Sequence, residues 1–344
     1  MNNPSNSPSR PEGLPEMAGG SKHRWRSALL KFGLSLGLVA IFLSIVDTST
    51  VLASLVAVDP ATMAAAVGLC FSQTLFVGFR WHALGHRTGG FVGRWQAMRI
   101  TFAAMFANQL MPTSIGGDLV RIGLLGRHGV PVGRGARTVV LDRTAGLLSL
   151  LTLMLVTGIV LGEQLPADWP VDFIKVLPVL AIVFIWAALF AGDRFADAVE
   201  ARLKSAWLAQ LLRDSSRLLR SGVTTVVILL LSYAVHSASA TCIWILAQGS
   251  GVEISFMEIL GFLPIVILVQ LAPVSIAGWG VREGTVITLF ALLGIDSAPA
   301  LATSILWGAA IASGAVLAGA IWFLTRSAGE RLPEQSASSD QSEA

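Results

Sequence analysis

The sequence predicts an all-α polytopic membrane protein with six full transmembrane helices and two re-entrant helical hairpins in an inverted repeat. Three observations lead to this fold class: an apolar composition, six apolar blocks of membrane-spanning length, and a motif that occurs twice. The 344 residues are 54% hydrophobic and 13% charged, with a mean hydropathy of +0.70, whereas soluble domains carry about 25% charged residues. A soluble fold is therefore excluded, and helices are favoured because lipid cannot hydrogen-bond the backbone.

Six apolar blocks have about the 20 residues that a bilayer requires. They are 27–46, 61–79, 138–160, 173–192, 222–246 and 298–324. The polar ends, 1–26 and 325–344, are expected to be disordered tails. The segment 193–221 is basic with interleaved leucines, so we expect a cytoplasmic linker that is either an amphipathic helix on the inner surface or a solvated loop.

Two further apolar regions, 97–126 and 256–295, are interrupted near their middles by Pro112 and Pro273. Nineteen of the 24 lysines and arginines fall on one predicted face, which makes that face, with both termini, cytoplasmic. Basic loops then flank 97–126 on both sides, and acidic loops flank 256–295. We therefore expect two re-entrant hairpins that enter a bacterial inner membrane from opposite sides.

A duplicated motif divides the chain into two halves. Leu110–Gly123 matches Leu271–Gly284 at eight of fourteen positions without gaps. The first half lies within 27–192, and the second takes 173–192 as its first span and continues through 222–324. Because three spans separate equivalent points, the halves are predicted to be inverted, as in transporters whose discontinuous helices form a substrate site near the midplane.

The chemistry of the motif favours an anionic ligand. Ser114 and Ser275 are expected to cap the returning helices, whose free amides attract phosphate. Arg121 and Arg282 are expected two turns along, where an unpaired arginine costs about 2.5–3.5 kcal/mol and a phosphate can accept two bonds from each guanidinium. Asn108 is interpreted as a helix–helix hydrogen bond or a site residue. The predicted substrate-binding residues are Arg121, Arg282, Asn108, Ser114, Ser275, Gly117 and Gly278.

Acidic residues are rare in the predicted membrane segments. Asp118 shares a helix face with Arg121, and we expect Glu283 to point away from its neighbour Arg282. Two interpretations stay open: these groups form internal ion bridges, or an arginine meets a lipid phosphate while an acid carries a coupling proton. The charge-balance or proton-coupling candidates are Asp118, Asp142, Arg143 and Glu283.

No cofactor or metal is predicted. The histidines lack metal-ligand spacing, and Cys70 and Cys242, both in apolar stretches, are interpreted as small packing residues. A net charge of +3 comes from basic residues scattered between apolar blocks, so no nucleic acid partner is expected.

The two-part pattern resembles the membrane domain of lysylphosphatidylglycerol synthases, whose stand-alone members are called flippase-like, over roughly 27–324. The resemblance implies movement of a lipid between leaflets, with hopanoid, polyprenyl-lipid or glycolipid cargo left open. It does not imply lysyl transfer, which belongs to a soluble domain that we do not expect here. The residues that carry it are Asn108, Pro112, Gly116, Gly117, Asp118, Arg121, Asp142, Arg143, Gly146, Pro273, Gly278, Gly280, Arg282 and Glu283.

The sequence thus predicts a lipid transporter or flippase for an anionic phospholipid or polyprenyl or terpenoid lipid, with no catalytic residues. Its expected partner is the membrane lipid; a homo-oligomer and an enzyme that makes the lipid stay open. The alternatives are an intramembrane lipid-modifying enzyme, such as a lipid-linked glycosyltransferase, and a non-transporting assembly subunit.

Overall fold

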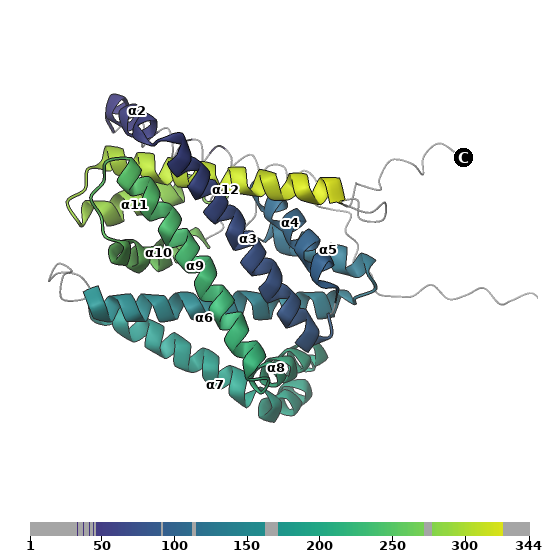
Figure 1. Cartoon of the computed structure of the whole chain (residues 1–344). Coiled ribbons are helices and arrows are strands. Elements are labelled where there is room, and N and C mark those ends of the chain that lie inside the picture. Colours follow the sequence, from purple (N-terminus) through teal and green to yellow (C-terminus); the bar gives the residue numbers. More distant parts are fainter. Residues whose placement is uncertain are drawn as a thin grey trace, which may run out of the picture.

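The computed structural model describes residues 46–90, 92–111, 115–161, 171–271 and 277–325, with a few isolated positions before Val46. Within these residues every regular element is a helix (Figure 1). The predicted residues Pro112, Ser114, Pro273 and Ser275, both tails and almost all of the block 27–46 lie outside them. The helices are α2 (Thr48–Ala57), α3 (Pro60–Thr88), α4 (Arg94–Leu110), α5 (Gly116–Arg127), α6 (Val132–Leu161), α7 (Val171–Leu203), α8 (Ala206–Leu219), α9 (Val223–Gly249), α10 (Phe256–Gln270), α11 (Val281–Ala291) and α12 (Ser297–Thr325).

Five of the described helices are long and apolar enough to cross a bilayer: α3, α6, α7, α9 and α12. Each apolar stretch has at least 26 residues, or about 39 Å at 1.5 Å per residue, against a hydrocarbon core of about 30 Å. The expectation of an all-helical multi-pass membrane protein is confirmed for the described residues.

The predicted linker 193–221 begins as a continuation of α7, which ends only at Leu203. Lys204 has a φ of 49°, and α8 follows. The expected amphipathic helix is therefore α8, and its buried residues, which include Ala209 and Leu218, pack against α7 and α3. Arg137 on α6 donates to Asp214 at 2.8 Å, which fastens α8 to the helical core.

Helices α3 and α9 pack side by side along much of their lengths (Figure 1). Three contacts fix their direction: Cys70 with Cys242, Gln73 with Ser239, and Arg80 with Ser232. In each pair the two residue numbers add up to 312, so one number rises as the other falls. The two helices are therefore antiparallel.

The helix bounds repeat along the chain with the offset of the duplicated motif. Adding 161 to the bounds of α3 gives 221–249, against Val223–Gly249 for α9. The same shift moves α4 to 255–271, against Phe256–Gln270 for α10. The internal resemblance therefore extends well beyond the fourteen motif residues.

Four short helices flank the two motifs. α4, α5, α10 and α11 have 17, 12, 15 and 11 residues, and none exceeds about 26 Å at 1.5 Å per residue. α4 lies against α5, and α10 against α11. In Figure 1 the two pairs lie toward opposite ends of the long helices, with α4 and α5 on the right and α10 and α11 on the left.

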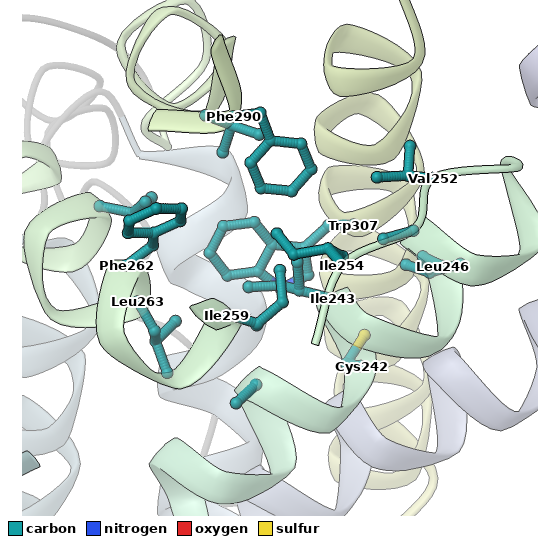
Figure 2. Packing of buried hydrophobic residues seen from close by; sticks show 14 of the residues in the cluster. Cys242, Ile243, Leu246, Val252, Ile254, Ile259, Phe262, Leu263, Phe290 and Trp307 are labelled. Atoms are coloured by element: carbon teal, nitrogen blue, oxygen red, sulfur yellow. The ribbon is translucent and has the colours of Figure 1, made fainter. Parts of the chain in front are cut away.

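The largest apolar cluster holds the second pair in place. Its side chains converge from α9, α10, α11 and α12 around Trp307, with Phe262 and Phe290 on neighbouring helices (Figure 2). All three rings are at most 6% exposed. Because such interiors are close-packed, the second half of α11 is held firmly against α12.

Candidate functional site: a buried charged cluster

A buried carboxylate on α6 joins two arginines from other helices. Asp142 accepts a hydrogen bond from Arg80 Nε at 2.7 Å and one from Arg121 Nη1 at 3.2 Å. All three residues are at most 6% exposed. Arg80 lies on α3 and Arg121 on α5, so this carboxylate joins α6 to both of these helices.

A second carboxylate extends the cluster toward the surface. Asp118 on α5 lies 2.8 Å from Nη2 of Arg143 and 3.8 Å from Nη1 of Arg121. The predicted pairing of Asp118 with Arg121 is thus present, but Arg143 is the closer partner. The side chain of Arg143 is 51% exposed, so the cluster opens to the exterior of the protein at this residue.

The cluster carries excess positive charge. It has three guanidinium groups, from Arg80, Arg121 and Arg143, and two carboxylates, from Asp118 and Asp142, which leaves a formal charge of +1. The Nε of Arg121 is buried and donates to no acceptor among the described residues. The arrangement can therefore accept one further anion.

Arg80 was not among the predicted site residues, because the apolar block ends at Phe79 and Arg80 was assigned to a cytoplasmic loop. That assignment is wrong: α3 continues to Thr88 and buries Arg80. Helical spacing indicates that Arg80 is buried, because Val77 and Leu84, three residues before it and four after it, are buried on the same face of α3. Ser232 on α9, also missed, accepts from Arg80 Nη1 at 3.0 Å.

The second motif places its arginine differently. Arg282 is the second residue of α11, not two turns along it. Its Nη2 donates to Glu283, so the expectation that Glu283 points elsewhere is wrong. The long, flexible arginine side chain folds back toward its sequence neighbour, and Ser304 on α12 lies within 3.3 Å of both groups.

Aromatic rings and a glycine enclose Arg282. Its guanidinium carbon lies 4.4 Å from the ring centre of Trp279 and 5.6 Å from that of Trp307, distances at which ring faces attract cations. A Cβ at Gly308 on α12 would overlap the guanidinium. Arg282 is 2% exposed and charge-balanced, which contrasts with the cluster around Arg121.

The starts of α5 and α11 have Ile115 and Gly280 at their N-cap positions. Ser114 and Ser275, predicted to cap these helices, lie outside the described residues, so their capping roles stay predictions. Asn108 on α4 accepts from the Gly117 N–H at 2.7 Å, a hydrogen bond between two helices as in the first of its two interpretations. A Cβ at Gly117 would overlap Asn108 and the backbone of α4, so only glycine allows this close approach.

Gly278 precedes α11 with a φ of 81°, a left-handed conformation that glycine adopts without strain. A Cβ there would also overlap the Gln270 amide at the end of α10. Three predicted residues of the second motif thus lie together: Gly278, Arg282 and Glu283. Among the described residues they form no ion pair with Asp142 or Arg143.

These features define a class: a multi-pass helical membrane protein that buries a positively charged cluster between one short helix, α5, and two long helices, α3 and α6. The model of the lysylphosphatidylglycerol synthase TM region matches residues 28–324, and the chain belongs to this family. It is also 29% identical over 114 residues to a UPF0104 membrane protein of Archaeoglobus fulgidus. That match covers 33% of this chain and 34% of the relative, so it spans about a third of either protein.

Proposed function

We propose that the protein moves an anionic lipid between the leaflets of a bacterial cytoplasmic membrane. The observation that carries this proposal is the cluster of three arginines and two aspartates with its half-exposed arginine. Arg143 lies five residues into the apolar block 138–160, or about 8 Å at 1.5 Å per residue. An exposed guanidinium at such a depth needs an anion or water, because charge in hydrocarbon is costly.

A lipid phosphate fits this cluster chemically. Guanidinium groups bind phosphate through two parallel hydrogen bonds, and Arg143 and Arg121 both contact Asp118, so one phosphate can bridge them in its place. The phosphate neutralises the excess charge and supplies an acceptor for Arg121 Nε. The acyl chains stay in the surrounding bilayer, which lowers the cost of moving the head group.

The proposal includes a re-entrant inverted repeat. Three facts support it: α4, α5, α10 and α11 are too short to cross, the two pairs lie toward opposite ends of the long helices, and α3 is antiparallel to its repeat partner α9. Two hairpins that enter from opposite faces meet near the midplane, where transporters of this architecture bind substrate. The basic residues near these ends of α3 and α4 (Arg87 and Arg94) and of α5 and α6 (Arg127 and Arg134) favour the cytoplasmic side for that face.

The remaining site residues receive separate roles in the proposal. Arg282 and Glu283 hold α11 against α12 through Ser304. Arg282 can bind a head group only when its ion pair with Glu283 breaks. Asp118 and Asp142 balance charge, and either can carry a coupling proton when the phosphate leaves. Ser114, Ser275, Pro112 and Pro273 lie outside the described residues and keep their predicted roles.

Reconstituted vesicles test the proposal. Vesicles with the purified protein and acyl-labelled fluorescent phosphatidylglycerol are treated with dithionite, which quenches only outer-leaflet label. Wild type is expected to expose the inner-leaflet label, and Arg143→Gln is expected to slow exposure about tenfold, because charge-assisted hydrogen bonds contribute about 1.5–3 kcal/mol. Arg143 is half exposed, so its loss should leave the fold intact.

A matched control separates charge at the cluster from charge in general. Arg213→Gln removes a guanidinium that pairs with Asp197 and Glu200 on the surface, and we expect normal rates. Rates unaffected by both Arg143→Gln and Arg121→Gln would refute the proposed site. Mass spectrometry of the extracted lipid tests the enzyme alternative, since transport returns the lipid chemically unchanged.

A further inference from the structure

An enclosed chamber of about 90 Å³ lies between α3, α4 and α12. Thr74 is fourteen residues from either end of α3, and Ile311 is fourteen from either end of α12. The chamber therefore lies at mid-depth between the ends of the spanning helices. Its lining residues are Cys70, Gln73, Thr74, Met105, Asn108, Gln109, Ile311 and Ala315.

Uncharged polar side chains line this chamber, and each has hydrogen-bonding capacity that no other described residue uses. The Oε1 of Gln73 accepts from Ser239 at 3.0 Å, and its Nε2 is buried with no partner among the described residues. Turning the amide over would let Nε2 donate to Ser239 but would leave Oε1 unpartnered. Either way, one end of the Gln73 amide is unsatisfied in a low-dielectric interior, and that is costly.

Three more polar groups surround the same space. No hydrogen bond joins the Thr74 hydroxyl or the Gln109 amide to another described residue, and Asn108 uses only its oxygen, on Gly117. Amides and hydroxyls both donate and accept, and none of the lining side chains is charged. The set suits a small group with hydroxyls, and its volume equals that of about three water molecules.

The chamber also lies close to the charged cluster. Asn108 bonds to Gly117, which precedes Arg121 by four residues on α5, or about 6 Å along the axis. A phosphate at Arg121 would thus place the far end of its head group near the chamber. We propose that the chamber binds the uncharged, hydroxyl-bearing part of the lipid head group, a small polyol; this inference rests on the proposed function.

Competition between two lipids tests the inference. Phosphatidylglycerol and phosphatidylpropanol with identical acyl chains carry the same phosphodiester charge, but only the first has head-group hydroxyls. The detergent-solubilised full chain is incubated with both at equal concentration, and bound lipid is counted by native mass spectrometry. Wild type is expected to retain the hydroxyl-bearing lipid about tenfold over the other, as one or two net hydrogen bonds would give.

Substitutions locate the preference. Thr74→Val keeps the side-chain shape and removes one hydroxyl, and Gln109→Leu removes an amide; each is expected to bring the ratio toward one. Thr241→Val is the control, because Thr241 on α9 is only half-buried, does not line the chamber and bonds only within its own helix. Normal thermal unfolding of Thr74→Val would show that a lowered ratio is not a folding defect.

The outcomes separate this inference from the proposed function. A wild-type ratio near one, or one unchanged in both chamber variants, overturns the chamber site even if vesicle transport is normal. A ratio that depends on Thr74 and Gln109 supports the site even if the vesicles show no transport. Excess free glycerol that lowers the ratio shows that the chamber also takes an unlinked polyol; a ratio that resists glycerol shows that the lipid-linked form is required.

Discussion

The charged cluster makes a quantitative prediction for Asp142→Asn. The carboxylate accepts from Arg80 at 2.7 Å and from Arg121 at 3.2 Å, and its side chain is 3% exposed. Replacing it with an amide leaves three guanidinium groups facing one carboxylate, so the formal charge of the cluster rises from +1 to +2. Two buried arginines then share an acceptor that carries no charge.

The expected loss is about 3–5 kcal/mol of unfolding free energy, the cost of breaking a buried ion pair by removing one partner. This is a large share of the 5–15 kcal/mol by which proteins are commonly stable. The penalty arises from the charges left behind. The double variant Asp142→Asn with Arg80→Met should therefore recover at least half of the loss, because Met fills much of the same volume without a charge.

Unfolding in mixed detergent micelles, followed by circular dichroism, measures these differences. Asp197→Asn serves as a control, since Asp197 pairs with Arg213 on the surface with 86% of its side chain exposed, and we expect no measurable change. A loss below about 1 kcal/mol for Asp142→Asn, typical of exposed pairs, would refute the buried network. So would a double variant less stable than the single one.

Three further predictions address the helix packing. Gly308→Ala should lower the free energy of unfolding by about 1–3 kcal/mol, because the new methyl group overpacks the core. Gly68→Ala, with no atom within 4 Å of its new Cβ, should stabilise α3 by up to about 1 kcal/mol. Unfolding of both variants in micelles measures the difference. Copper-phenanthroline oxidation should link Cys70 to Cys242, whose sulfurs lie 3.6 Å apart, and peptide mass mapping without the link would contradict the α3–α9 register. Hydrogen bonds from the Thr62 hydroxyl and nearby amides hold the pKa of Asp59 below its usual value. The cap that Asp59 provides for α3 therefore persists at neutral pH and is lost as pH falls through that lowered pKa. Hydrogen exchange should show that the first turn of α3 frays in acid, and that Asp59→Asn removes this pH dependence.

Periodicity and composition predicted much of the helical architecture, because lipid imposes a simple rule on apolar length. The blocks 61–79, 138–160, 173–192 and 298–324 each fall inside one observed helix, and 222–246 does so except for its first residue. Helix ends were predicted less well, since charged residues can extend a helix beyond the apolar core. α3 continues past Phe79 and α7 past Gly192 for this reason.

The sequence predicted most residues of the candidate site, but few of the contacts between them. Asp118, Arg121, Asp142 and Arg143 meet as one cluster, but the central partner Arg80 was assigned to a loop. Contacts between α3, α5 and α6 depend on tertiary packing, which a single sequence does not encode locally. The chamber could not be predicted from the sequence either. Gln73, Thr74 and Gln109 line one cavity only because α3 and α4 pack together in the fold.

The two copies of the motif have diverged in a way that bears on transport. Asp118 corresponds to Trp279 and Ile122 to Glu283 under the 161-residue offset. The first copy therefore has its acid, Asp118, one helical turn before the arginine, where Arg143 also pairs with it. The second copy has its acid, Glu283, next to Arg282, and these two residues pair with each other. One copy retains a net positive charge and the other is neutral, so an anion should bind the first more strongly. The binding we propose is thus asymmetric: the phosphate binds beside α5 and α6, and Arg282 on α11 is available to a head group only after Glu283 releases it.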